Sequence, residues 1–387
     1  MNIWLTYGII AVILVAAELV YFRIADRCNI IDKPNERSSH STIVLRGGGI
    51  LFPISILIWM GLEMVNGEWL TVQGYLPFVV GLVMICAVSF WDDVKSLPDS
   101  VRLVVQFVAT AVMMFSLGFQ DSGFMSLAWY WQAAIGIVAL VVIVGATDVY
   151  NFMDGINGIT AGYSLAVLVP LLAVNGAGLM VQGEIAGQAR NEALRQAQGP
   201  VQGAMEFVEP SMLVVVLIGV LVFSWFNFRP KGKAKCFAGD VGSVGIAFIL
   251  LFAIGRLIVR TGDVTWLIFL VVYGVDGVLT IIHRFMLHEH IGQAHRKHAY
   301  QIMANELKMS HVVVSLLYMC IQLAVSLGFI YLCPATVLAH WIYLIGVIVV
   351  LAVGYVVFMK KYYHLHEEYL KSLEFLLGQA NKFERRD

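Results

Sequence analysis

Charged residues are scarce in this chain of 387 residues. Asp, Glu, Lys and Arg together make up 13% of it, whereas 59% of the residues are hydrophobic and the mean hydropathy is +0.81. A water-soluble domain of this composition would expose large apolar patches, so the sequence predicts an integral membrane protein. Alternating ten-residue segments typical of membrane β-barrels are also missing. The expected fold is therefore all-α, a polytopic bundle of membrane helices.

Metal-binding and disulfide patterns are missing as well. The five cysteines are scattered without CxxC spacing, which argues against a zinc site and a disulfide framework. No HExxH pattern occurs among the ten histidines. No basic stretch precedes the first apolar run and no small-residue cleavage site follows it, so we expect this run to be a retained membrane span.

Apolar runs, by contrast, recur along the whole chain, and hydropathy predicts about eleven spans, with about ten as the alternative. These spans cover residues 3–22, 47–65, 76–91, 101–119, 128–147, 156–175, 211–228, 241–259, 264–282, 311–332 and 337–359. Of the 25 Lys and Arg residues, 21 lie on one side of this arrangement. By the positive-inside rule that side is cytoplasmic, which places the N-terminus outside and the C-terminus inside. We expect a transmembrane domain over residues 1–360 and a cytoplasmic amphipathic tail over residues 361–387.

Two adjacent carboxylates, Asp92 and Asp93, end the third predicted span. Like charges at the carboxyl end of a helix resist ionisation unless a cation is near. The pair therefore suits a general base or the neighbour of a metal ion. The alternative is a solvated pair that ends the helix together with Lys95.

Polar residues and glycines alternate in the stretch NFMDGINGI, between the fifth and sixth spans. Asn151, Asp154 and Asn157 are three residues apart, which predicts a shared helical face. Gly155 and Gly158 leave room for a ligand or another helix to approach the backbone. Because the sixth predicted span starts here, its free N–H groups would attract an anion. Small-residue helix packing is the alternative.

Glycines also mark two other predicted helix starts. In the stretch GDVGS, Asp240 suits Mg²⁺ ligation through oxygen, and the amides around Gly242 suit a phosphate. A helix N-cap is the alternative role for Asp240. Arg46 precedes three glycines at the start of the second span. The sequence thus repeats an anion-binding pattern at helix starts on the predicted cytoplasmic side.

Basic residues gather late in the chain. Six histidines lie within residues 283–311, together with Arg284, Arg296 and Lys297. They suit recognition of a phosphate or a sugar, and a solvated basic loop facing anionic lipid is the alternative. Asp276 lies inside the ninth predicted span, where a carboxylate is either functional or paired with a basic residue such as Arg284.

The order of these motifs resembles that of the polyprenyl-phosphate N-acetylhexosamine-1-phosphate transferase family, over roughly residues 26–301. The family's DD motif is similar to Asp92 and Asp93, its basic residue one helix later to Arg102 with Gln106, its NxxDGxxG motif to Asn151, Asp154, Gly155, Asn157 and Gly158, and its GDxGS motif to Gly239, Asp240, Gly242 and Ser243. The predicted topology also resembles the branch of the family that starts O-antigen and teichoic acid synthesis.

The resemblance implies transfer of an amino-sugar 1-phosphate, such as that of N-acetylglucosamine, from a UDP-sugar to undecaprenyl phosphate. The reaction would occur at the cytoplasmic face of the inner (plasma) membrane, release UMP and start a lipid-linked cell-envelope glycan such as lipopolysaccharide O-antigen. It implies Mg²⁺, with Mn²⁺ as the alternative, on the diphosphate. The residues carried over are Asp240 and Asn151 as metal ligands, Asp92, Asp93 and Asp154 as catalytic residues, and Arg102, Lys95, Gly155, Asn157, Arg296 and His298 as substrate contacts. Whether Asp92 or Asp93 is the base, and whether a phospho-enzyme forms, stays open.

Two departures from the family pattern bear on the sugar. Asn157 stands where many members have Asp, and the late loop reads HRKHAYQ where HxHH is common. Only Arg296 and His298 carry over there, while Tyr300 and Gln301 take the remaining places. The sugar is therefore open between N-acetylglucosamine and a deoxygenated amino sugar.

The sequence lacks the patterns of two other classes of membrane protein. A CDP-alcohol type transferase requires DGxxAR followed by GxxxDxxxD, which neither Asp154-Gly155 nor Asp276-Gly277 satisfies. A transporter requires charged residues deep in several spans and an internal repeat. Only Asp276 and Arg256 approach the first condition, and no repeat is evident. The expected partners are the two substrates and membrane lipid, not nucleic acid, and a homodimer is compatible with the sequence.

Overall fold

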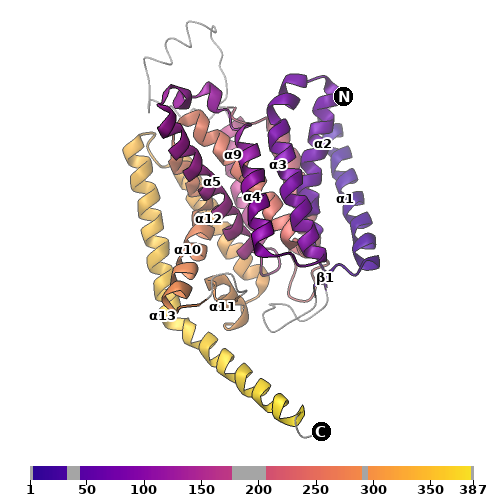
Figure 1. Ribbon diagram of the computed structural model, residues 1–387, viewed down its shortest axis with the longest axis vertical. Helices are drawn as coiled ribbons and strands as arrows, with labels where there is room; N and C mark the ends of the chain where they lie inside the picture. The colour runs from indigo at the N-terminus through magenta and orange to yellow at the C-terminus, as the bar shows by residue number, and fades with distance from the viewer. Residues whose placement is uncertain (1–2, 33–43, 177–205, 290–294, 385–387) are drawn as a thin grey trace.

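The computed structural model describes residues 3–32, 44–176, 206–289 and 295–384, and the structural statements that follow concern these residues. It consists mainly of helices, so the predicted all-α membrane bundle is confirmed (Figure 1). The α-helices are α1 (Ile3–Arg27), α2 (Leu51–Asn66), α3 (Trp69–Val94), α4 (Asp99–Met114), α5 (Trp129–Phe152), α6 (Ile159–Gly176), α8 (Pro210–Asn227), α9 (Gly239–Thr261), α10 (Val271–Met286), α11 (Ala299–Asn305), α12 (His311–Tyr331) and α13 (Val337–Glu384). Short 3-10 helices η1 (Gly48–Ile50), η2 (Phe119–Asp121), η3 (Gly123–Ser126) and η4 (Val264–Leu270) and strands β1 (Ile31–Asp32) and β2 (Val44–Leu45) complete the described chain.

Every predicted span coincides with a helix. Within the described ranges, nine helices are long and apolar enough to cross a membrane. The sixth predicted span is a shorter apolar helix, Ile159–Asn175, and the fourth is α4, which has 16 residues. Helix α6 is buried along most of its length. A helix too short to cross the membrane is tolerated here because protein, and not lipid, surrounds the polar backbone groups at its ends. The assignment of the two membrane sides stays a prediction.

Helix α9 forms the centre of the bundle. Of its apolar segment 83% is buried, and it packs against α2, α3, α5 and α6. Phe248 and Phe252 stack on Phe78 of α3, while Gly81 lets the α3 backbone approach Ala109 of α4. Since lipid chains are as apolar as these side chains, close packing holds such helices together. This packing fixes the first turn of α9, which carries Asp240.

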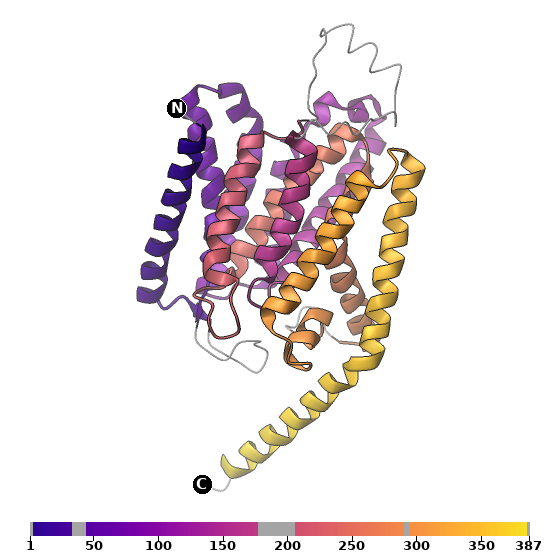
Figure 2. The same ribbon diagram turned by 180° about the vertical axis from the view of Figure 1, so that it is seen from behind.

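The irregular connections that matter for the site lie at one end of the bundle. Strands β1 and β2, helix α11 and the start of α9 are at the end opposite to the start of α1 (Figures 1 and 2). The two strands pair antiparallel, with Ile31 opposite Leu45, and Leu45 also bridges to Cys236 just before α9. The hairpin therefore holds Arg46, the next residue, against the start of α9.

The predicted tail is an extension of the last span. Helix α13 runs without interruption through residue 360 and leaves the bundle at its carboxyl end (Figure 1). His366 Nδ1 lies 2.9 Å from Oε1 of Glu306, the residue directly after α11. The tail is thereby attached to the loop region next to the site, and its contact with a membrane surface stays a prediction.

Candidate active site

Three carboxylates from two helices meet at the start of α9. Asp93, whose side chain is fully buried, accepts hydrogen bonds from the backbone N–H groups of Asp240 (2.9 Å) and Val241 (3.0 Å). The carboxyl groups of Asp92 and Asp240 lie within hydrogen-bonding reach of each other. Asp93 thus caps α9 from the neighbouring helix, whereas Asp92 and Asp240 form the more accessible pair.

Arg46 joins two of these carboxylates. Its Nε lies 2.6 Å from Asp93 Oδ1, and its guanidinium lies 3.3 Å from Asp240 Oδ1. Burial lowers the pKa of Arg46, but the carboxylates of Asp93 and Asp240 outweigh that effect and raise the pKa above its usual value. Arg46 therefore stays charged, and it is the site residue that the carried-over motifs did not include; the three glycines after it were its signal in the sequence.

Those glycines allow two helix starts to touch. Gly48 N–H donates to Phe237 O at 2.8 Å, and Gly49 N–H donates to Ala238 O at 3.0 Å. A Cβ placed on Gly242 would lie 2.6 Å from Gly49 Cα, closer than real atoms approach. The predicted glycine pattern therefore serves a backbone-to-backbone contact that brings Arg46 to α9.

Arg102, on the first turn of α4, is the second cation of the cluster. It lies 3.2 Å from Asp92 Oδ2 and 3.6 Å from Asp240 Oδ2. One turn later, Gln106 donates to Asp148 Oδ1 at 2.9 Å. The cluster of three carboxylates and two guanidiniums carries a formal net charge of about −1 at neutral pH. It therefore retains negative charge for a further cation.

The donors in this cluster fit a Mg²⁺ ion that is shared with a substrate. Asn151 Oδ1 accepts a hydrogen bond from Ser243 Oγ at 2.7 Å, which places an amide oxygen beside the first turn of α9 near Asp240. In the part of the chain that the structure describes, no group of three His, Cys, Asp or Glu side chains forms a metal cage. Mg²⁺ usually takes one or two protein carboxylates and completes its shell with water and phosphate oxygens, so an oxygen-rich, incomplete donor set suits it.

Asn151, Asp154 and Asn157 do not share a helical face, and that prediction is wrong. Helix α5 ends at Phe152 and α6 begins at Ile159, so the motif forms the turn between two helices. Asp154 Oδ1 accepts from Thr160 Oγ1 at 2.5 Å. Burial raises the pKa of Asp154 to about 7, although this hydrogen bond opposes the shift. Asp154 is thus a carboxyl group poised to exchange a proton near neutral pH.

Asn157 ties this turn to other segments. Its side-chain amide donates to Arg229 O (3.0 Å) and Pro230 O (3.1 Å), and its N–H donates to His311 Nδ1 at 3.3 Å. It is 2% exposed. The following Gly158 has φ +85°, in the left-handed region, and a Cβ there would overlap the ring of Phe228. The structure shows a packing role for Asn157, and its contact with a nucleotide stays a prediction.

Arg296 and His298 hold the loop before α11. Arg296 lies 3.3 Å from Glu306 and 4.5 Å from the ring centre of Tyr369. His298 Nδ1 lies 3.4 Å from Asp276 Oδ1, so Asp276 does lie against a basic side chain, but this is His298 and not the expected Arg284, which pairs with Glu289. Their contact with a sugar stays a prediction.

Three other basic residues lie at the same end of the bundle as the cluster: Arg284, Lys297 and Lys95. Arg284 pairs with Glu289 at 3.2 Å, and Lys297 pairs with the same Glu289. Lys95 is exposed directly after α3, next to the carboxylates in sequence, and its substrate contact stays a prediction.

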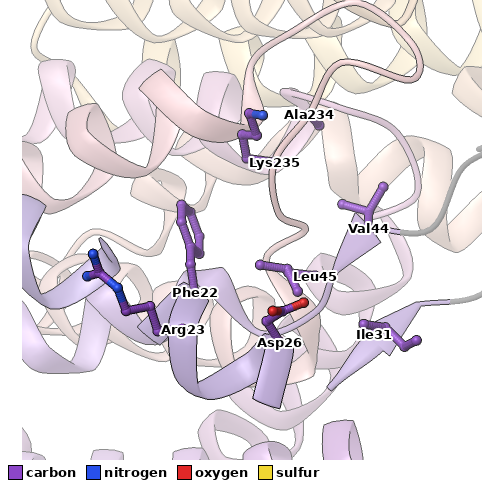
Figure 3. A pocket seen from close by; sticks show the side chains of 8 residues that line it. All are labelled: Phe22, Arg23, Asp26, Ile31, Val44, Leu45, Ala234 and Lys235. Atoms are coloured by element: carbon purple, nitrogen blue, oxygen red, sulfur yellow. The ribbon is translucent and has the colours of Figure 1, made fainter. Parts of the chain in front are cut away.

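A cavity of about 510 Å³ lies between α1, the two short strands and the segment before α9 (Figure 3). It is lined by Phe22, Arg23, Asp26, Ile31, Val44, Leu45, Ala234 and Lys235. None of the paired carboxylates lines it, and it contains a single carboxylate of its own. We assign the chemistry to the cluster around Asp240, because charge and backbone N–H groups converge there.

Sequence comparisons show which known proteins the chain resembles. The model of glycosyl transferase family 4 matches residues 75–258. A probable undecaprenyl-phosphate N-acetylglucosaminyl 1-phosphate transferase of Bacillus subtilis is 25% identical over 326 residues, which cover 81% of this chain and 80% of that protein. The decaprenyl-phosphate N-acetylglucosaminephosphotransferase of Mycobacterium tuberculosis (strain H37Rv) is 24% identical over 62% of this chain and 58% of that protein.

A third relative matches a smaller part of the chain. The undecaprenyl-phosphate alpha-N-acetylglucosaminyl 1-phosphate transferase of Salmonella typhi is 26% identical over 37% of this chain and 38% of that protein. The chain thus spans four fifths of the Bacillus protein and less than two thirds of the other two. The family match contains Asp92, Arg102, Asn151 and Asp240, and it ends before the loop that carries Arg296.

Proposed function

We propose that the chain, of which residues 75–258 match the model of glycosyl transferase family 4, transfers a sugar 1-phosphate from a nucleotide sugar to a polyprenyl phosphate at a membrane. The names of the three relatives give N-acetylglucosamine phosphate transfer and undecaprenyl or decaprenyl phosphate, which supports the transferred group and the carrier. The observation that carries the proposal is the cluster in which Asp92, Asp240, Arg46 and Arg102 converge on the start of α9. In such a cluster the two guanidiniums, together with a metal ion on the carboxylates, would hold a diphosphate.

The finer assignments are part of the same proposal. The donor is a UDP-sugar and the acceptor undecaprenyl phosphate. A lipid phosphate oxygen attacks the β-phosphorus, the bond from that phosphorus to the bridging oxygen breaks, and UMP leaves with that oxygen. Mg²⁺, held by Asp240 and Asn151, would neutralise charge on the diphosphate. The site faces the cytoplasm, where Lys and Arg gather by the positive-inside rule.

The chain's own residues divide the remaining work. Arg46 and Arg102 expose 32% and 24% of their side chains and would contact phosphate oxygens of the donor. Asp92 faces Arg102 and exposes 9% of its side chain, so it is our candidate to accept a proton from the lipid phosphate or to position it. Asp93, with no exposed side-chain surface and two backbone N–H partners, holds α9 and Arg46 in place. A direct transfer without a phospho-enzyme is consistent with this division.

The test is a transfer assay with purified protein, Mg²⁺, undecaprenyl phosphate and a panel of radiolabelled UDP-sugars. We expect lipid-linked product and UMP with at least one sugar. Asp240→Asn should weaken the dependence on Mg²⁺, whereas Asp99→Asn, an exposed carboxylate on the first turn of α4, should not. Full activity of Asp240→Asn would remove the metal assignment, and absence of product across the panel would remove the proposed reaction.

A further inference from the structure

Helix α11 packs against the end of α5 and the turn that follows it. Tyr300, which is fully buried, donates its hydroxyl to Phe152 O at 3.0 Å. A Cβ placed on Gly155 would overlap that hydroxyl and would lie 3.1 Å from Gln301 Nε2. Gly155 is not at a positive φ, so its backbone would accept alanine. The glycine is therefore required for the approach of Tyr300, and the space above it is filled by protein.

Asp276 of α10 fixes the position of Tyr300. Its Oδ1 accepts from Ala299 N–H at 3.1 Å, and its Oδ2 accepts from the Tyr318 hydroxyl at 2.5 Å and from Tyr300 N–H at 3.4 Å. His298 Nδ1 lies 3.4 Å from the same carboxylate. Buried polar groups with several partners hold one geometry, because any displacement leaves a donor or acceptor unpaired. Asp276 is thus an anchor that spans α10, α11 and α12.

We propose that Asp276 and Tyr300 form a brace that fixes the turn over residues 152–155, and that Tyr300 is a positioning residue for Asn151 and Asp154. Asn151 directly precedes the braced residues and Asp154 lies among them, so a shift of the turn displaces both. A displacement of about 1 Å at reacting groups lowers turnover by about 100-fold. Within the HRKHAYQ sequence, the Tyr300 hydroxyl fills the space that a side chain at position 155 would need, and it holds the turn there. The positioning role of Tyr300 rests on the proposed transfer reaction.

The chain offers a matched control for this contact. Tyr343 donates its hydroxyl to Val325 O at 3.0 Å, and a Cβ on Gly328 would overlap that hydroxyl too. This second pair has the same geometry and lies in α12 and α13, away from the carboxylates. Variants of the Tyr343–Gly328 pair show the effect of losing such a contact anywhere in the protein, so any additional effect at Tyr300 and Gly155 is due to the brace.

The experiment measures Tm, kcat and KM for Gly155→Ala, Tyr300→Phe and the double variant, beside Gly328→Ala and Tyr343→Phe. Tyr300→Phe should lower kcat about tenfold with KM for the donor unchanged, and Tyr343→Phe should leave kcat unchanged. Gly155→Ala should lower Tm and kcat further, and adding Tyr300→Phe should return both toward the values of Tyr300→Phe alone, because the hydroxyl that overlaps the new methyl is gone.

Lack of recovery in the double variant would overturn the brace and would show that Gly155 is needed by a ligand. Two of the readouts need no substrate: the Tm series, and hydrogen exchange of the amides at residues 152–155, which should accelerate at least tenfold in Tyr300→Phe. Wild-type exchange in that variant overturns the inference even where the transfer reaction itself is absent. Conversely, recovery of Tm and faster exchange in a protein without turnover support the brace and reject the proposed function.

Discussion

Replacing Arg46 by methionine tests the charge balance of the site. The substitution keeps most of the apolar stem and removes the guanidinium that lies 2.6 Å from Asp93 Oδ1 and 3.3 Å from Asp240 Oδ1. Leaving one member of a buried ion pair uncompensated costs about 3–5 kcal/mol. Since 32% of the Arg46 side chain is exposed and solvent screens part of the interaction, we expect a loss of about 2–3 kcal/mol.

Thermal unfolding in detergent measures this loss, with Arg23→Met, an exposed arginine of α1, as the control. Turnover should fall at least about 100-fold, because the variant loses a phosphate contact and the support of α9 together. The Tm and turnover of Arg46→Lys should lie between those of Arg46→Met and the wild type, since lysine keeps the charge but lacks the planar guanidinium that bridges two carboxylates.

A double variant identifies the cause. Adding Asp93→Asn to Arg46→Met removes the uncompensated carboxylate and should recover part of the Tm, although not the turnover. A single Arg46→Met variant with the Tm and turnover of the Arg23→Met control would refute the reasoning about the cluster.

Three more predictions follow from the same geometry. Asp240→Asn removes one of three neighbouring carboxylates, so its Tm without Mg²⁺ should equal or exceed that of the wild type while its turnover falls by at least about tenfold; a large fall in Tm would contradict the repulsion between Asp93 and Asp240. Burial raises the pKa of Asp154 from 3.8 to about 7; the charges of Asp240 and Asp32 add to this shift, and that of Arg46 opposes it. The folded state therefore favours the protonated form, and the stability gained in this way is present below pH 3.8 and is lost as the pH rises to about 7. Activity that needs the ionised form rises over the upper part of that range. Thr160→Val removes the hydrogen bond that opposes the shift and should move the rising limb of the pH–rate profile to higher pH, and an unmoved limb would exclude Asp154 as its origin. A protein with all five cysteines replaced by alanine should keep its turnover within about twofold, because Cys236, the cysteine just before α9, donates to Glu18 and not to a carboxylate of the cluster; loss of turnover with retained Tm would show a catalytic thiol.

The helices could be predicted from the sequence because apolar runs of sufficient length specify them directly. The meeting of Asp92 and Asp93 with Asp240 was also accessible, since each motif ends or starts a span on the same predicted side. Position in the chain does not reveal which carboxylate is buried. That Asp93 caps α9 while Asp92 stays accessible depends on how α3 packs against α9.

Other parts of the site depend on contacts between distant segments. Spacing of three residues is typical of a helical face, but in the NFMDGINGI stretch Asn157 bonds to Arg229 and Pro230, and the chain turns instead. The role of Arg46 follows from the contact of Gly49 with Gly242, and that of Tyr300 from its overlap with Gly155. Such contacts join residues far apart in the sequence, and a single sequence does not show which glycine lies against which partner.

The most direct measurement of the proposed reaction follows the two phosphorus atoms of the donor. UDP-sugars labelled with ³²P at either the α- or the β-phosphorus are incubated with the purified protein, Mg²⁺ and undecaprenyl phosphate, and the label is traced into lipid and aqueous phases. The account predicts that the β-label enters the lipid with the sugar and that the α-label is recovered as UMP, and that both transfers are lost in Asp240→Asn. Recovery of both labels together as UDP, with the sugar alone on the lipid, would contradict it.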